Sequence, residues 1–189
     1  MSNVVLVTGG FDPIHKGHIE YFKEAKLLGD KLIVGLNSDH WLTRKKGKPF
    51  MDLENRAMVI QSLNMVDEVI IFNDEDNTSC HAIHQALQFY DEVIFANGGD
   101  RLISNIPEYE KYSNDERVKF VCNVGGDKTE SSSWLLDKWK SPKTLRKWGY
   151  YKDLYLGKGF KVKELVIKPF SCLSMQRHEY RSELWNLVS

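Results

Sequence analysis

The stretch Gly9-Gly10-Phe11-Asp12-Pro13-Ile14-His15-Lys16-Gly17-His18 follows the apolar run Val4-Val5-Leu6-Val7 and organises the rest of the chain around it. An apolar, β-branched run followed by a glycine-rich turn and a helical pattern indicates strand, turn and helix. Such a turn in an open α/β sheet presents free backbone N–H groups and the positive end of a helix dipole to a phosphate. His15 and His18 can add donors or positive charge where charge develops on a phosphoryl group.

Short apolar runs alternate with helical periodicity over the first 139 residues. Strands are predicted at Val4–Thr8, Lys31–Leu36, Glu68–Phe72, Glu92–Ala96 and Val118–Cys122. Helices are predicted at Gly17–Leu28, Asp52–Leu63, Ser79–Tyr90, Pro107–Asn114 and Ser132–Trp139. Buried strands that alternate with helices favour a Rossmann-like α/β fold, with a parallel sheet and helices on both faces. Ligands of such sheets bind beyond the C-terminal ends of the strands.

The pattern changes near residue 140. We predict one domain over residues 1–139, a polar and basic linker over 140–149, and a small β segment over 150–189. Strands are predicted in that segment at Tyr150–Leu156, Lys161–Lys168 and Trp185–Val188, with turns at the glycines and proline between them. The fold class is therefore α/β with a small C-terminal β segment.

Composition places the chain among ordinary globular proteins, with 42% apolar and 28% charged residues in 189. No apolar run is long enough to span a bilayer and no signal-peptide pattern is present, so we expect a cytoplasmic protein that does not bind membranes. Residues 1–139 carry 15 Lys/Arg against 22 Asp/Glu, and residues 140–189 carry 11 against 4. The basic residues are dispersed, which favours packing on an acidic surface over nucleic-acid binding. The three cysteines are expected to be reduced.

Residues 3–139 resemble the cytidylyltransferase-like nucleotidyltransferases. Within that family they are most similar to the glycerol-3-phosphate cytidylyltransferases and to the adenylyltransferase domain of the bifunctional ADP-heptose synthesis enzyme. The residues that carry the resemblance occur in the family's order: Gly10-Phe11-Asp12, His15-Lys16-Gly17-His18, Leu28–Val34, Asn37-Ser38-Asp39, Arg44-Lys45-Lys46-Gly47, Glu54-Asn55-Arg56, Val66–Val69, Asn97-Gly98-Gly99-Asp100 and Ser131-Ser132-Ser133.

The resemblance implies that a phosphate-monoester oxygen attacks the α-phosphorus of CTP or ATP and that pyrophosphate leaves. Because the nucleophile is already an anion, no general base is required, and catalysis would come from positioning and charge stabilisation. His15 and His18 would contact the triphosphate and stabilise the transition state. Lys45 or Lys46 would reach across the triphosphate from a mobile basic loop, and the sequence does not distinguish between the two lysines.

Other matching residues are expected to bind the two substrates. Those of the nucleotide site are Gly9, Gly10, Phe11, Gly17, Asn97, Gly98, Gly99, Asp100, Ser131, Ser132 and Ser133, the serines at a helix N-terminus. Arg56, together with Asp39, would face the phosphate of the acceptor. Asp12 either helps to hold Mg²⁺ through water or stabilises the turn.

The choice between CTP and ATP stays open, as does the acceptor, for which a sugar or polyol phosphate is expected. Gly99-Asp100-Arg101 stands where glycerol-phosphate enzymes carry an acidic pair and a tryptophan, and so resembles the heptose-type pattern. Two alternatives are an adenylyltransferase of pantetheine-phosphate or nicotinamide-mononucleotide type and a lapsed nucleotide-binding scaffold subunit.

Residues 148–189 resemble the start of a cupin domain of mannose-6-phosphate isomerase and mannose-1-phosphate guanylyltransferase type, through Trp148–Tyr151, Phe160–Lys163, Leu165–Pro169 and Leu173–His178. Cupins bind a metal through a His-x-His pair, but Tyr180 replaces its second histidine. We therefore expect a truncated β unit without a metal site. Its open strand edges would pair with another subunit or with the first domain, which favours a homo-oligomer such as a dimer.

Overall fold

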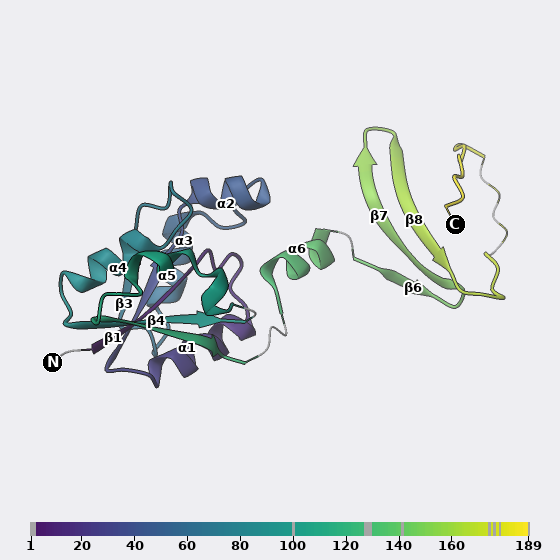
Figure 1. Ribbon diagram of the computed structural model, residues 1–189. Coiled ribbons are helices and arrows are strands. Elements are labelled where there is room, and N and C mark those ends of the chain that lie inside the picture. The colour runs from purple at the N-terminus through teal and green to yellow at the C-terminus, as the bar shows by residue number, and fades with distance from the viewer. Residues whose placement is uncertain are drawn as a thin grey trace. The chain divides into compact units, whose positions relative to one another are not determined.

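The computed structural model describes residues 3–99, 101–126, 130–140, 142–173, 175, 177 and 179–188. The chain divides into two compact units, residues 1–136 and 137–189, and Figure 1 shows the elements of each. Among the described residues, no helix combines the length and the apolar character needed to cross a membrane. Every candidate site residue belongs to the first unit.

A five-stranded parallel sheet forms the centre of the first unit, in the order β3-β2-β1-β4-β5. Val5 pairs with Leu32 on one side of the central strand and with Ile94 on the other. The sheet therefore changes direction between β1 and β4, which is the switch point where open α/β sheets bind ligands. The strands are β1 (Asn3–Gly9), β2 (Lys31–Leu36), β3 (Glu68–Ile71), β4 (Glu92–Gly98) and β5 (Val118–Val124).

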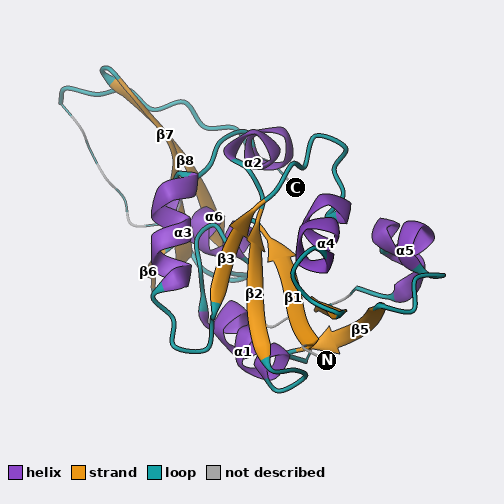
Figure 2. Ribbon diagram, turned by 90° about the vertical axis from the view of Figure 1, so that its left-hand side faces the viewer, coloured by secondary structure: helices purple, strands orange, loops and turns teal. Residues whose placement is uncertain are grey.

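Helices cover both faces of this sheet, as Figure 2 shows. Val5, Val7 and their neighbours pack against α1 and α3, whereas Val4 and Leu6 pack against α4 and α5. Alternate residues of one buried strand thus supply two apolar cores. The helices are α1 (Lys16–Lys26), α2 (Asp39–Lys46), α3 (Leu53–Gln61), α4 (Cys80–Leu87), α5 (Pro107–Tyr112) and α6 (Ser132–Lys140), with a 3₁₀ turn, η1, at Ile103–Asn105. The α/β prediction is confirmed.

The expected basic loop at residues 44–47 is wrong, because Arg44, Lys45 and Lys46 form the last turn of α2. The Ser38 side chain caps the start of this helix by accepting a hydrogen bond from Trp41 N. Gly47 ends it with a positive φ of 86°, a conformation that favours glycine. Basic residues at a helix C-terminus interact favourably with the helix dipole, so a helix accommodates this sequence well.

The second unit is a three-stranded antiparallel sheet in the order β6-β7-β8. Its strands are β6 (Thr144–Arg146), β7 (Gly149–Gly157) and β8 (Phe160–Ile167), so β6 lies within the stretch expected to be a linker. The strand predicted at Trp185–Val188 is wrong, since these residues form no regular structure. Trp185 and Leu187 are exposed there among the residues that the structure describes.

Candidate active site

His15 and His18 lie together at the start of α1, directly after the glycine turn. His15 is the residue before the helix and His18 lies in its first turn, so one helical turn stacks the two rings with their centroids 3.6 Å apart. The backbone N–H of His15 donates to Nδ1 of His18 over 3.3 Å. Because Nδ1 is the acceptor, a neutral His18 carries its proton on Nε2. The pair therefore offers an imidazole N–H donor at the switch point of the sheet.

The pKa of each histidine is lower than the ordinary value. Burial is the largest cause for His18, followed by the charges of His15 and Lys46, and its pKa falls to about 3. Burial also lowers the pKa of His15, while Glu130 acts in the opposite direction. Both rings are therefore neutral near pH 7 in the absence of a ligand, and they act as hydrogen-bond donors rather than as fixed cations.

Of the two candidate lysines, Lys46 lies at the glycine turn. Its Nζ donates to the carbonyl oxygen of Asp12 over 3.0 Å. Burial lowers its pKa, an effect that Asp12 opposes and Arg56 reinforces. The Nζ of Lys45 instead lies 4.3 Å from the centroid of the Trp41 ring, in a cation–π contact. The structure thus brings Lys46, and not Lys45, to the histidine pair.

The two glycines of the turn are required by close packing. A Cβ on Gly9 would meet the ring of Phe11 at 2.9 Å, and one on Gly10 would meet Leu42 of α2 at 2.7 Å. Phe11 itself adopts a positive φ of 47° and packs its ring edge-to-face on Phe22. Its side chain is buried in the core beneath the turn, so only its backbone is available to a nucleotide.

Asp12 anchors the segment between α2 and α3 to the turn. Its two carboxylate oxygens accept hydrogen bonds from Phe50 N at 2.6 Å and from Met51 N at 2.8 Å, and the residue is 1% exposed. The described residues hold no group of three or more His, Cys, Asp or Glu that could bind a metal alone. Mg²⁺ usually takes few protein carboxylates and completes its shell with water and substrate phosphates. Both carboxylate oxygens of Asp12 thus hold the turn, one of its two expected roles, and its contact with Mg²⁺ through water stays a prediction.

Arg56 lies under the turn rather than facing solvent. Its guanidinium is fully buried and uses four of its five N–H donors, on Met51 O, Gly10 O, Asn37 O and Asp39 Oδ1 at 2.6–3.2 Å. Asp39 also accepts a hydrogen bond from Leu53 N. The two residues expected to face the acceptor thus join the turn to α2 and α3. Both residues belong to motifs visible in the sequence, but the sequence did not reveal that Arg56 is buried.

The C-terminal end of β4 faces α1 through a residue that the sequence did not single out. Tyr21 donates its hydroxyl proton to Ala96 O over 2.6 Å, and burial raises its pKa. Beyond it, Asn97 is buried and its Nδ2 has no hydrogen-bond partner among the described residues. Gly98 and Gly99 follow at the end of the strand, whereas Asp100 lies outside the described residues. The aromatic pair Tyr21-Phe22 within the predicted helix is the sequence signal that could have pointed to this contact.

The serine cluster brings the start of α6 to the same turn. Ser132 donates its hydroxyl proton to Pro13 O over 2.9 Å, and Ser131 and Ser133 flank it. Glu130, which the sequence analysis missed, lies 3.9 Å from Nδ1 of His15 and 3.6 Å from Nζ of Lys16. Gly17 follows these two residues in α1, where an added Cβ would lie 3.3 Å from the His15 ring. An acidic residue directly before the serines is the signal that could have identified Glu130.

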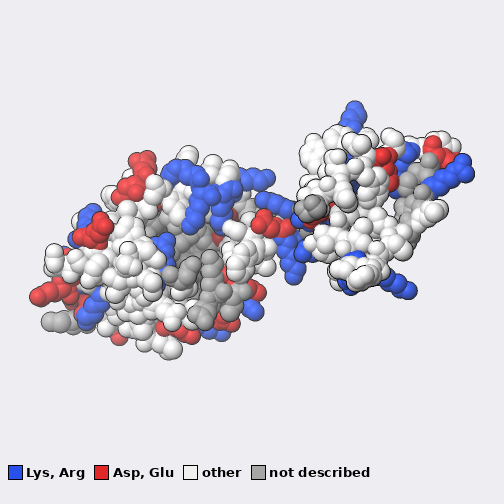
Figure 3. Space-filling view, turned by 45° about the vertical axis from the view of Figure 1, so that its right-hand side comes forward, with Lys and Arg blue, Asp and Glu red and all other residues white. Residues whose placement is uncertain are grey.

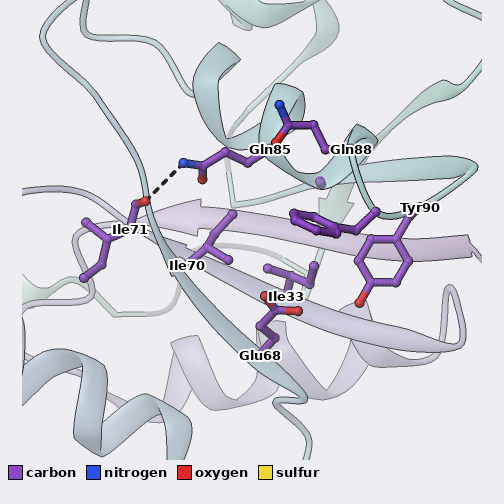
Figure 4. Close-up of a pocket in the computed structure, with 9 residues that line it drawn as sticks. Ile33, Glu68, Ile70, Ile71, Gln85, Gln88 and Tyr90 are labelled. Atoms are coloured by element: carbon purple, nitrogen blue, oxygen red, sulfur yellow. Dashed lines mark hydrogen bonds between the residues drawn. The ribbon is translucent and has the colours of Figure 1, made fainter.

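A separate pocket of about 310 Å³ lies on the α4 side of β2 and β3 (Figure 4). Ile33, Ile70 and Tyr90 contribute apolar side chains, and Gln85 donates to Ile71 O over 3.5 Å. It shares no residue with the candidate site, and its polar groups are few. It is not the place where the motif residues converge.

Fold and site together define a nucleotidyltransferase, and the comparisons assign its family. The cytidylyltransferase-like family model matches residues 6–164, so the chain belongs to that family. The bifunctional protein HldE of Helicobacter pylori strain P12 is 37% identical over 141 residues, which is 74% of this chain and 28% of that protein. HldE of Wolinella succinogenes is 37% identical over 99 residues, 51% of this chain and 20% of that protein. The chain thus matches between a fifth and little more than a quarter of the length of these relatives.

Solved structures agree with this assignment. A lipopolysaccharide core biosynthesis protein from Thermoplasma volcanium is 32% identical with a TM-score of 0.51, over 65% of this chain and 97% of that one. A nicotinate-nucleotide adenylyltransferase from Vibrio parahaemolyticus, described as putative, is 13% identical with a TM-score of 0.52 over 73% of this chain and 86% of that one, and shows the fold alone. The cupin resemblance of residues 148–189 finds no support, since the family match itself runs to residue 164.

Proposed function

We propose that this protein transfers a nucleotidyl group, CMP from CTP or AMP from ATP, to the phosphate of a sugar or polyol phosphate. An acceptor phosphate oxygen attacks the α-phosphorus, the bond from that phosphorus to the oxygen bridging to the β-phosphorus breaks, and pyrophosphate leaves. The observation that carries the proposal is the stacked His15–His18 pair beside Lys46, on the glycine turn at the start of α1. Donors and a cation gathered there suit a polyphosphate.

The histidine pair would act on charge that develops at the transferring phosphoryl group. In the neutral form, Nε2–H of His18 donates to a phosphate oxygen, because Nδ1 is already occupied by His15 N. A nearby polyanion favours the protonated form of each imidazole, so the pKa of both residues would rise as the nucleotide binds. Donors fixed in place before the reaction need no reorganisation as the charge builds up.

Lys46 and the α6 N-terminus would hold the leaving pyrophosphate from two sides. Lys46 is tied to the turn through Asp12 O, and Ser132 is tied to it through Pro13 O. Free N–H groups and hydroxyls at a helix start bind phosphate oxygens well. Mg²⁺, held by those phosphates and by Asp12 through water, would supply further charge neutralisation.

Two similarities support a sugar or polyol phosphate as acceptor. The sequence resembles the adenylyltransferase domain of the bifunctional ADP-heptose synthesis enzyme, and the Thermoplasma protein of the same fold at 32% identity is described as a lipopolysaccharide core biosynthesis protein. Both descriptions belong to carbohydrate biosynthesis. The 13% identity to a nicotinate-nucleotide adenylyltransferase gives no comparable support for a nucleotide acceptor.

A screen of pyrophosphate release tests the proposal. The purified chain is incubated with Mg²⁺ and with CTP or ATP against sugar-1-phosphates, heptose phosphates, glycerol-3-phosphate, aminoalcohol phosphates and nicotinamide mononucleotide. We expect release with one nucleotide and with a sugar or polyol phosphate. Release only with the mononucleotide would contradict the acceptor class, and nucleotide binding without release from any pair would favour the scaffold alternative.

A further inference from the structure

A hollow of about 410 Å³ lies beyond the C-terminal ends of β2 and β3, between α2 and residues 72–75. Six of its lining side chains are polar: Ser38, His40, Arg44, Asn73, Asp74 and Glu75. With the exception of the motif residue Ser38 and of Arg44 in the basic stretch, the family resemblance singled out none of them. Its volume is within the range of small-molecule sites.

One residue, Asn37, connects this hollow to the glycine turn. Asn37 N donates to Gly9 O over 3.1 Å, and its Nδ2 donates to Oδ2 of Asp74 over 3.1 Å. Arg56 reinforces the connection, because one of its terminal nitrogens donates to both Gly10 O and Asn37 O. Asn37 is therefore hydrogen-bonded both to the turn and to the wall of the hollow. An acceptor that binds both places would hold its phosphate at the turn and extend past Asn37 into the hollow.

The back wall of the hollow is fixed before any ligand arrives. The carboxylate of Asp74, which is 3% exposed, accepts from Asn37 Nδ2, from Ser38 N at 2.7 Å and from the Ser38 hydroxyl at 2.7 Å. Arg44 Nη2 donates to Asp74 O and to Asn77 Oδ1 at 2.8 and 3.2 Å. A wall held by this network costs a ligand little ordering of side chains.

Two basic side chains at this wall remain available to a ligand. Arg44 uses one terminal nitrogen, and no partner among the described residues takes its other terminal nitrogen. His40 is exposed in the first turn of α2. Figure 3 shows basic side chains gathered on the surface of the first unit. The last turn of α2 contributes three basic residues, Arg44, Lys45 and Lys46.

Both donors and acceptors line the hollow, which suits hydroxyl groups. Arg44 donates, Glu75 accepts, and Asn73 and His40 can each do both. A ligand hydroxyl also donates and accepts, so several hydroxyls can satisfy such a set, whereas a second phosphate would meet the Glu75 and Asp74 carboxylates. Resting on the proposed function, we infer that this hollow binds the hydroxyl-bearing carbon chain or ring of the acceptor and so determines its identity.

The test compares His40→Ala and Arg44→Gln with matched changes at exposed residues of the first unit outside the hollow. His84→Ala, in the last turn of α4, and Arg117→Gln, before β5, are the exposed controls. With the acceptor found in the release screen, each hollow variant should raise the acceptor KM about tenfold, because it removes a hydrogen bond from a charged or polar donor. The nucleotide KM and kcat should change less than about twofold, and the controls should match the parent.

Acceptors that lack one hydroxyl sharpen the test. The parent enzyme should lose affinity for at least one deoxy acceptor, and the matching hollow variant should show no further loss with it, since the same hydrogen bond is already missing. If the parent enzyme turns over and both hollow variants keep its acceptor KM, this inference is wrong and the proposed function still stands. Absence of turnover with every acceptor contradicts the proposed function, and the inference with it.

Discussion

The polar groups on the two sides of the glycine turn differ in whether their hydrogen-bond donors are left for a ligand or used within the protein. On the α1 side, His15, His18 and Lys46 have lowered pKa values and donors left for a ligand. On the α3 side, Arg56 is fully buried and donates four hydrogen bonds to other residues of the protein. Both sides belong to the same set of motif residues. The difference separates groups that can meet the substrate from groups that hold the turn in place.

Substitution of Arg56 should have the largest effect, and on stability. Arg56→Met leaves the carbonyls of Gly10 and Asn37 and the carboxylate of Asp39 without their donor. We expect the free energy of unfolding to fall by about 3–5 kcal/mol, measured by urea denaturation. Arg146→Met, at an exposed arginine of β6, should change it by less than about 0.5 kcal/mol. A stable Arg56→Met protein with only a raised acceptor KM would instead place Arg56 against the acceptor.

Substitution of His18 should affect turnover far more than folding. His18→Ala removes a donor to the transferring phosphoryl group, and kcat should fall about 10²- to 10³-fold. The nucleotide Kd, measured by calorimetry, should change much less, because the ground state keeps its other phosphate contacts. Equal losses in kcat and in nucleotide affinity would contradict a transition-state role of His18.

The lowered pKa of His18 makes stability depend on pH. The unfolded chain protonates this imidazole below about pH 6.5, whereas the folded chain resists protonation until about pH 3. Stability is therefore complete above about pH 6.5 and falls as the pH drops towards 3, by up to a few kcal/mol. Urea unfolding at about pH 7 and about pH 5 measures the loss. His18→Gln should show a flatter profile, and an identical profile would contradict the shift.

Removal of the Glu130 carboxylate should have the smallest effect, and a favourable one. Glu130 faces His15 and Lys16, where an incoming triphosphate would meet its negative charge. Glu130→Gln should lower the nucleotide KM about two- to fivefold at low ionic strength, and less in high salt. Steady-state kinetics at two salt concentrations checks this, and a raised KM would mean that the carboxylate assists binding.

The fold of the first unit was largely predictable because its signals are local. The apolar runs of β1, β2 and β4, together with the glycines at Gly9 and Gly10, indicate a doubly wound sheet without any tertiary information. The helix α2 was missed because its sequence is mostly polar and basic, and its stability comes from the Ser38 cap and from Leu42 packing under Gly10. Tertiary packing overrode the pattern there.

The candidate site was predictable in composition but not in geometry. A motif identifies Arg56 and Asp12 as important, yet their buried contacts with Gly10 O and with the backbone of Phe50 and Met51 depend on long-range packing. The choice between Lys45 and Lys46 likewise depends on where the two side chains lie around α2, with Lys46 at Asp12 O and Lys45 at the Trp41 ring. Glu130 adjoins the serine motif, which is a signal in the sequence, but its approach to His15 depends on the three-dimensional fold.

The identity of the reaction products tests the central claim most directly. The chain is incubated with Mg²⁺, the nucleotide and the acceptor found in the screen, and the products are followed by ³¹P NMR and mass spectrometry. Attack at the α-phosphorus yields pyrophosphate and the acceptor joined to the nucleoside through a new diphosphate bond, and His18→Ala should slow both together. A nucleoside diphosphate with a newly phosphorylated acceptor would instead mean attack at the γ-phosphorus, and would contradict nucleotidyl transfer at this turn.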